Sequence, residues 1–82
     1  EMKIAFANKA LQTYDDLPKE LKAKADKQFS LILKNFRHPS VKAKKYNEEL
    51  DIWQGRLDRS WRFYFKIERD VIFVVAITKH PK

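Results

Sequence analysis

The sequence predicts an α+β fold: a small, mostly antiparallel β-sheet of about four strands, with two N-terminal helices packed on one face. Residues 61–67 (WRFYFKI) alternate between aromatic or aliphatic and polar side chains, as a half-buried strand does. Residues 71–78 (VIFVVAIT) are apolar on both faces, which is typical of a central strand. Between residues 18 and 36, apolar side chains recur at helical spacing, so this segment should be an amphipathic helix that covers the sheet.

The N-terminal half is expected to supply one strand and both helices. Residues 3–7 should form a short strand with Ile4 and Phe6 on one face, and Asn8 can cap a brief helix. Pro18 either ends that helix or opens the next one. The stripe of the second helix comprises Leu21, Ala25, Phe29, Ile32, Leu33 and Phe36. Its lysines lie elsewhere on the helix. Such a cationic helix could instead lie on a membrane or bind an acidic groove, but the sheet needs a cover, which favours core packing.

The C-terminal half is expected to contain the functional face. The sequence RHPS at residues 37–40 should end the second helix, because the residue before a proline avoids helical angles. Residues 41–51 form a connector, first basic and then acidic, that should border the site. Hairpins at residues 58–60 and 68–70 would join the three strands that follow. Alternation then buries the aromatic side chains of residues 61–67 and displays Arg62, Tyr64 and Lys66 together on the open face.

Length and composition exclude several classes of function. The 82 residues suffice for one domain, residues 1–82, which is too small for a deep, enclosed cofactor pocket. The chain has no cysteine, and its histidines, His38 and His80, are far apart, so neither a metal nor a small-molecule cofactor is expected. No apolar run approaches the roughly 20 residues that span a bilayer, and no signal peptide is evident, so we expect a cytoplasmic protein without a membrane partner.

The charge favours a polyanionic or acidic partner. Eighteen basic residues against eleven acidic ones give a net charge of +7, and residues 37–66 alone hold eight basic and four acidic residues. Surface lysines often serve only to solvate a protein, whereas arginines in the middle of a strand, such as Arg56 and Arg62, are better candidates for anion binding. Gly55 is the only glycine, which excludes a Gly-rich phosphate loop.

Four short motifs and the order of the elements point to a family. The motifs are LPKEL at residues 17–21, the Arg-His-Pro turn at residues 37–39, the pair Trp61-Arg62 that opens a strand, and the ending Lys79-His80. Together with the order strand, two helices, three strands, they resemble the RelE/ParE superfamily of toxins from bacterial type II toxin–antitoxin systems. The resemblance spans nearly the whole chain and is one of pattern, because no single motif is diagnostic.

The resemblance implies a toxin that, in its RNA-cleaving branch, enters the ribosomal A site and cuts messenger RNA without a metal. In that reaction the substrate's 2′-hydroxyl attacks the adjacent phosphate, which leaves a cyclic phosphate and a free 5′-hydroxyl. The chemistry needs a base for the hydroxyl, cations for the charge that develops on the phosphate, and an acid for the leaving oxygen.

The resemblance assigns catalytic roles to five residues. Arg62 matches the strand arginine that contacts the phosphate, and its planar, permanently charged fork suits that task; the alternative is a surface ion pair with Glu68 or Asp51. Arg56 matches a basic strand position of the RNA-cleaving members and could bracket the same phosphate. His80 falls at the position of the general acid, with Lys79 as its substitute. The candidate base is Glu49, or its neighbour Glu48.

Further residues are predicted to bind RNA or phosphate: Lys44, Lys45, Gln54, Tyr64 and Lys66. The chain departs from the family at two of its positions. Gln54 occupies a position where potent members have lysine, and the chain stops before the C-terminal tyrosine that some relatives use against the substrate bases. Tyr64, or Tyr46 in the connector, would then stack on a base instead.

Three hypotheses for function follow. The first is a ribosome-dependent messenger RNA endonuclease, the second is a ParE-like inhibitor of DNA gyrase on the same fold, and the third is a non-catalytic, basic RNA-binding module. Both toxin hypotheses imply a cognate acidic antitoxin that covers the basic face and the helices.

Overall fold

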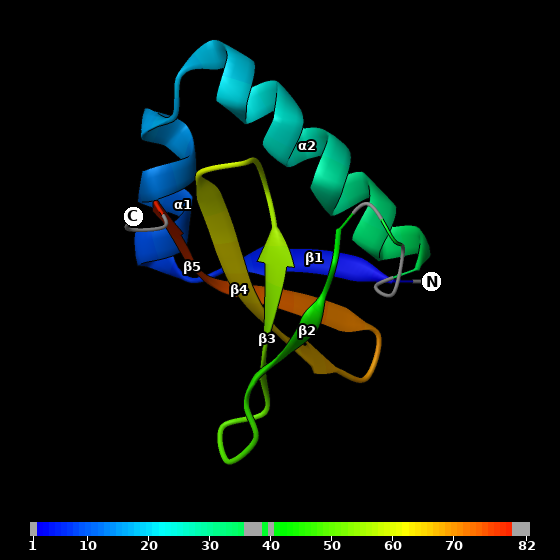
Figure 1. The fold of residues 1–82 in the computed structure, drawn as a ribbon. Coiled ribbons are helices and arrows are strands. Elements are labelled where there is room, and N and C mark those ends of the chain that lie inside the picture. Colours follow the sequence, from blue (N-terminus) through cyan, green and yellow to red (C-terminus); the bar gives the residue numbers. More distant parts are fainter. Residues whose placement is uncertain (1, 36–38, 40, 80–82) are drawn as a thin grey trace.

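The computed structural model describes residues 2–35, 39 and 41–79, and within them two helices and five strands (Figure 1). The elements are β1 (Lys3–Phe6), α1 (Asn8–Asp16), α2 (Lys19–Lys34), β2 (Lys44–Asn47), β3 (Ile52–Arg56), β4 (Trp61–Glu68) and β5 (Val71–Lys79).

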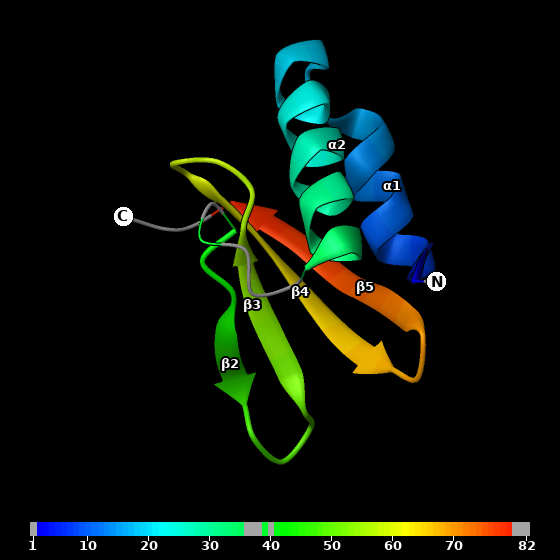
Figure 2. The same cartoon turned by 90° about the vertical axis from the view of Figure 1, so that its right-hand side faces the viewer.

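The five strands form one mixed sheet in the order β1-β5-β4-β3-β2. β1 pairs in parallel with β5, and every other neighbouring pair is antiparallel. Both helices cover the same face of the sheet, and the hairpin of β2 and β3 extends away from them (Figure 2). β5 lies between β1 and β4, as its apolar sequence predicted. The predicted α+β class is confirmed, with five strands where four were expected.

The additional strand is β2, within the segment predicted to be a connector. Its sequence, KKYN, shows no alternation of apolar and polar residues and contains little to bury, so it resembles a loop. It becomes a strand because the edge of β3 offers it backbone partners, with Lys44 opposite Gln54 and Lys45 opposite Trp53. Short, lysine-rich edge strands also protect a sheet from pairing with other chains.

The core lies between α2 and β4 and is aromatic. Phe63 and Phe65 are fully buried, as the alternation predicted, and the Phe29 ring of α2 meets Phe63 edge-on, with ring centroids 5.1 Å apart. The Phe6 ring of β1 also contacts the Phe29 ring, with ring centroids 5.4 Å apart. The two helices are joined above this cluster, where the Tyr14 hydroxyl donates a hydrogen bond to Asp26.

A β-bulge lets β5 keep its apolar residues in the core. Tyr64 pairs with Ala76 but Phe65 pairs with Val74, so Val75 is an extra residue in the ladder. Ile72, Val74 and Ile77 are all buried, although a regular alternation would have placed Ile77 on the open face.

The helix boundaries differ slightly from those predicted. Asn8 is the first residue of α1 and not its cap; the cap is Ala7, which makes no side-chain capping bond. α2 begins directly after Pro18 and ends at Lys34, two residues earlier than expected. The predicted turn residues Arg37 and His38 lie outside the described residues. Neither helix, within the described chain, is long and apolar enough to cross a membrane.

Gly55 should be intolerant of a side chain. A Cβ added there would lie 2.4 Å from the Cζ atom of Phe63, its cross-strand partner, which is fully buried and has little room to move. We predict that Gly55→Ala lowers the free energy of unfolding by about 1–3 kcal/mol, the usual penalty for overpacking, as measured by urea denaturation. Phe63→Leu in the same chain should recover part of that loss, giving a non-additive double-mutant cycle. Wild-type stability of Gly55→Ala would contradict this packing.

Candidate functional site

A cleft on the open face of the sheet gathers four cations. It has a volume of about 410 Å³ and is lined by Lys42, Lys44, Gln54, Arg56 and Arg62. No carboxylate is among the described residues that line it. The two ion pairs that join described residues, Lys24 with Asp58 and Lys45 with Asp51, involve none of these four cations. The cleft is therefore a concentration of uncompensated positive charge, suited to a phosphate or another anion.

Two arginines face each other directly across β3 and β4 at the centre of this charge. Arg56 is the cross-strand partner of Arg62. The Arg56 N–H donates to the Val41 carbonyl at 2.7 Å and so points away from β4. The pair is therefore of the non-hydrogen-bonded kind, in which the Cα atoms are typically about 4.5 Å apart. Like charges placed opposite one another destabilise a sheet, and a bound anion would relieve the repulsion.

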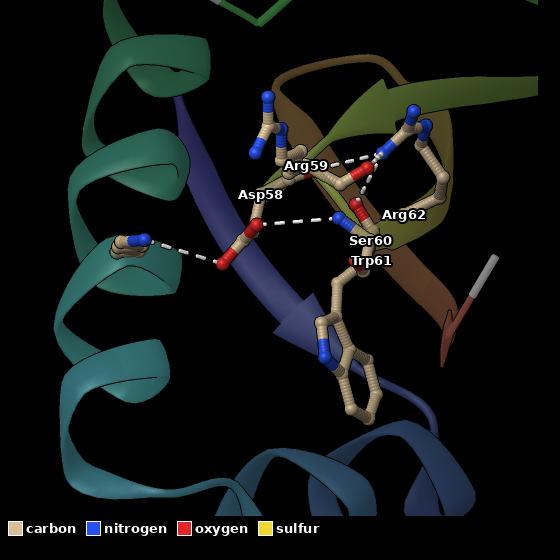
Figure 3. A network of polar contacts seen from close by, with 6 residues as sticks. Asp58, Arg59, Ser60, Trp61 and Arg62 are labelled. Carbon is tan, nitrogen blue, oxygen red and sulfur yellow. Dashed lines mark hydrogen bonds and ion pairs between the residues drawn. The ribbon is translucent and has the colours of Figure 1, made fainter.

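The turn between β3 and β4 fixes the Arg62 side chain. Its Nη1 donates to the carbonyls of Asp58 at 2.6 Å, Trp61 at 2.9 Å and Arg59 at 3.3 Å (Figure 3). The expected alternative, an ion pair with Glu68 or Asp51, does not occur, because no described carboxylate pairs with Arg62. All three bonds use Nη1, so donors on Nη2 and Nε remain for a ligand. The guanidinium is thus oriented in advance by neutral acceptors that leave its charge uncompensated.

Asp58 shapes that turn and ties it to α2. Its Oδ1 accepts a hydrogen bond from the Ser60 N–H at 3.2 Å, and its Oδ2 lies 3.3 Å from the Lys24 ammonium (Figure 3). Burial raises the pKa of the Asp58 carboxyl, but the hydrogen bond from Ser60 and the charge and hydrogen bond of Lys24 outweigh burial, so the pKa lies below its ordinary value. Asp58 therefore stays ionised and holds the turn whose carbonyls orient Arg62.

Arg56 is positioned through its backbone. Gln28 is a buried polar residue of α2, and its Nε2 donates to the Arg56 carbonyl at 2.6 Å. The carbonyl of Val41, a fully buried residue, accepts the Arg56 N–H. Both backbone groups of Arg56 are thus bonded, which fixes where its side chain leaves the sheet.

Lys42 and Lys44 form the outer wall of the cleft, and both are exposed. Lys42 has a φ of 53°, a left-handed conformation that is uncommon outside glycine, immediately after the buried Val41. This conformation turns the chain toward β2. Strained backbone positions of this kind concentrate at functional sites.

The predicted RNA-binding residues divide between the two faces. Lys44, Gln54 and Tyr64 are consecutive partners across β2, β3 and β4, so they share the open face, and Gln54 Nε2 donates to the Tyr64 hydroxyl at 3.1 Å. Lys66 follows Tyr64 on the same face of β4 but does not line the cleft. Lys45 lies on the opposite face, where its ammonium is 4.7 Å from the centre of the Trp53 ring and bonds to Asp51.

Most of the predicted proton-transfer groups are not brought to the cleft. Lys79 pairs with Trp61 and so lies on the face opposite Arg62. Glu49 is exposed in the turn between β2 and β3, beyond Ile52, and Ile52 itself is about 13 Å from Arg56 at the usual strand rise. His80 lies outside the described residues.

Two residues of the site were missed by the sequence analysis. Lys42 gives no periodic signal, because it precedes β2 in an irregular segment. Gln28 does give one: it follows Ala25 by three residues and so is a single polar side chain within the apolar stripe of α2. A buried amide in such a stripe must be hydrogen-bonded, and here it holds the backbone of a site residue.

The lowered pKa of Asp58 predicts a pH-dependent stability. Because the folded-state pKa is depressed, the ionised carboxylate contributes stability above the unfolded value of about 3.9, and this is lost as the pH falls through the folded-state pKa. Asp58→Asn keeps an acceptor for Ser60 but removes the charge. We predict that Asp58→Asn lowers the free energy of unfolding by about 1 kcal/mol at pH 7, as measured by urea denaturation. At pH 3 the difference from wild type should be smaller. A difference that stays constant with pH would contradict this role.

The fold is similar to those of solved toxin structures. No family model and no curated protein sequence matches the chain. Solved structures do match: the YoeB–YefM complex from Staphylococcus aureus, with a TM-score of 0.81, 17% identity and 99% of each chain covered; and the isolated E. coli RelE toxin, with a TM-score of 0.82, 19% identity and coverage of 100% of this chain and 87% of that chain.

A third match is the YoeB/ParE toxin from Agrobacterium tumefaciens, with a TM-score of 0.68, 16% identity and coverage of 98% of this chain and 100% of that chain. At such identities the likeness establishes the fold and leaves the activity open. The resemblance found in the sequence is confirmed at that level: the chain has the RelE-like toxin fold.

Proposed function

We propose that this protein is the toxin of a type II toxin–antitoxin system and a ribosome-dependent messenger RNA endonuclease that inhibits translation. The observation that supports this best is the cross-strand pair of Arg56 and Arg62 in a cleft with two further cations and no carboxylate. Such a cleft suits a phosphodiester whose negative charge increases during reaction, because fixed cations stabilise that transition state more than the ground state.

The proposed reaction needs no reactant besides the RNA. The 2′-hydroxyl oxygen bonds to the adjacent phosphorus while the bond from phosphorus to the 5′-oxygen breaks. The 2′-oxygen loses one proton and the 5′-oxygen gains one, so the products are a cyclic phosphate and a 5′-hydroxyl. Arg62, with donors left on Nη2 and Nε, binds the non-bridging oxygens together with Arg56. Lys42 and Lys44 neutralise the flanking phosphates.

Proton transfer is assigned to the end of β5. His80 follows Lys79 directly in the sequence, and Thr78 of the same strand is the cross-strand partner of Arg62. We propose His80 as the donor to the 5′-oxygen, since imidazole titrates near neutral pH. Lys79, the substitute expected from the sequence, lies on the face opposite Arg62 and is not assigned this role. Glu49, predicted from the sequence as the base, lies in the hairpin turn. In this proposal the proton of the 2′-hydroxyl therefore passes to water, and the four cations favour the ionised oxygen.

The proposed partner besides messenger RNA in the ribosomal A site is an acidic antitoxin. The matching structures include complexes with antitoxins, among them YoeB–YefM and RelBE. The net charge of +7 favours an acidic partner for this chain, and we place the complex in the cytoplasm.

Arg62→Ala tests the proposal. It should abolish cleavage, because it removes the guanidinium that the turn holds ready for the phosphate, while the chain still folds, since Arg62 is only half-buried and adds no core volume. The measurement is the mapping of messenger RNA 5′ ends in a purified translation reaction, with and without ribosomes. Arg59→Ala is the matched control: Arg59 is an exposed arginine of the same turn that does not line the cleft, and its carbonyl bond to Arg62 survives the substitution.

Two outcomes would contradict the proposal. Equal cleavage by the Arg59→Ala and Arg62→Ala variants would show that the cleft is not the site of the reaction. Absence of any cut with wild-type protein, together with inhibited DNA supercoiling, would favour the gyrase inhibitor, a possibility supported by the structural match to a YoeB/ParE toxin. Glu49→Gln distinguishes the two possible acceptors of the 2′-hydroxyl proton, water and the Glu49 carboxylate. Unchanged cleavage would favour water, and lost cleavage would favour the carboxylate.

A further inference from the structure

A second hollow lies beside the cleft on the open face of the sheet. Its volume is about 320 Å³, and it is lined by Tyr46, Ile52, Tyr64, Val75, Ala76 and Thr78. Among the described residues, no lysine or arginine lines the hollow, in contrast to the cleft, and no carboxylate lines either of them. Tyr46 is 59% exposed, and its ring meets that of Tyr64 edge-on, with ring centroids 4.7 Å apart. Ring surface that Tyr64 does not cover is therefore open to a ligand.

Two β-bulges build this hollow. In β2, Lys45 pairs with Trp53 and Asn47 with Ile52, so Tyr46 is the extra residue, as Val75 is in β5. Bulges redirect side chains and occur often beside functional sites. Both extra residues line the same hollow although they come from strands separated by β3 and β4.

The hollow and the cleft are in direct contact. Gln54 lines the cleft and donates a hydrogen bond to the hydroxyl of Tyr64, which lines the hollow. Thr78, at the rim of the hollow, is the cross-strand partner of Arg62 in the cleft. Two cross-strand pairs share this face: Arg56 with Arg62, and Gln54 with Tyr64. The two pairs are two residues apart along their strands, which is about 7 Å. That distance is comparable to the reach from a nucleotide's phosphate to its own base.

We infer that the cleft and the hollow form one site for a single-stranded nucleic acid, with a phosphate between Arg56 and Arg62 and the neighbouring base in the hollow against Tyr46. The inference rests on the proposed function and adds to it a requirement for an unstacked base. A base within a duplex is covered on both faces and cannot enter the hollow, whereas a single strand can turn one base onto an aromatic ring. The adjoining cations favour a nucleotide over an apolar peptide side chain or a second copy of this chain.

Binding of a short RNA, separated from cleavage, tests the inference. The probe is a labelled single-stranded RNA of about six nucleotides, with 2′-O-methyl groups that prevent cleavage. A series of otherwise identical probes lacks one base at each position in turn. Binding is measured by fluorescence anisotropy over a range of salt concentrations. Tyr46→Leu keeps an apolar side chain but removes the ring. Leu50→Ala is the matched control, because Leu50 is an exposed apolar residue of the same hairpin outside the hollow.

We expect Tyr46→Leu to weaken binding about tenfold, as the loss of one stacked base does, and to leave the salt dependence unchanged. It should have no further effect on the RNA that lacks the sensitive base. Arg56→Gln should instead reduce the salt slope by about 0.7, the value for one phosphate contact on a single strand. Leu50→Ala should bind like the wild type.

Equal affinity of wild-type protein for the complete and base-free RNAs would overturn the inference and leave the endonuclease proposal intact. If Leu50→Ala loses as much RNA affinity as Tyr46→Leu, the inference is overturned in the same way. It is also overturned if the wild-type protein is a dimer and Tyr46→Leu makes it a monomer, because the hollow would then be a contact between two copies of the chain. Absence of RNA binding together with absence of ribosome-dependent cuts would instead overturn the proposed function itself.

Discussion

The register between β3 and β4 is the constraint on which both the core and the site depend. Gly55 faces Phe63 across the two strands, and without a Cβ it leaves space for the Phe63 ring beneath α2. The next pair along the strands is Arg56 with Arg62, on the opposite face. A slip of one residue would expose Phe63 and bury an arginine. The aromatic core therefore enforces the placement of two like charges that would otherwise move apart.

That placement is maintained against electrostatic repulsion by neutral contacts. The Asp58, Arg59 and Trp61 carbonyls hold Arg62, while Gln28 and Val41 bond the backbone of Arg56. Carboxylates would stabilise the unbound protein better, but they would compete with a phosphate for the same donors. Neutral acceptors orient the guanidinium and leave its charge for the ligand, which is the trade-off between stability and activity expected at a binding site.

The sequence predicted what depends on periodicity. Alternation in β4 identified Phe63 and Phe65 as core and Arg62 as open-face, and the apolar run of β5 identified a central strand. It could not predict what depends on pairing between distant segments. KKYN becomes a strand only because β3 is beside it, and the faces on which its lysines lie follow from that pairing.

The same limit applies to the site residues. Lys45 was grouped with Lys44 because both are basic neighbours, yet successive residues of a strand point to opposite faces, so Lys45 lies against Trp53 while Lys44 lines the cleft. Gln28 illustrates the opposite case: the polar residue within the apolar stripe was visible in the sequence, but its partner, 28 residues further along, was not.

The described part of the open face separates binding from proton transfer. Four cations and one amide are the described residues that line the cleft, and they include neither a carboxylate nor an imidazole. Fixed cations alone can bind a phosphate and stabilise its transition state, whereas protonation of the leaving oxygen needs a titratable group. In the proposed reaction that group is His80, which follows Thr78, the cross-strand partner of Arg62, by two residues in the sequence. The same cleft can therefore serve an endonuclease or a binding protein, and the distinction depends on a few residues at the end of one strand.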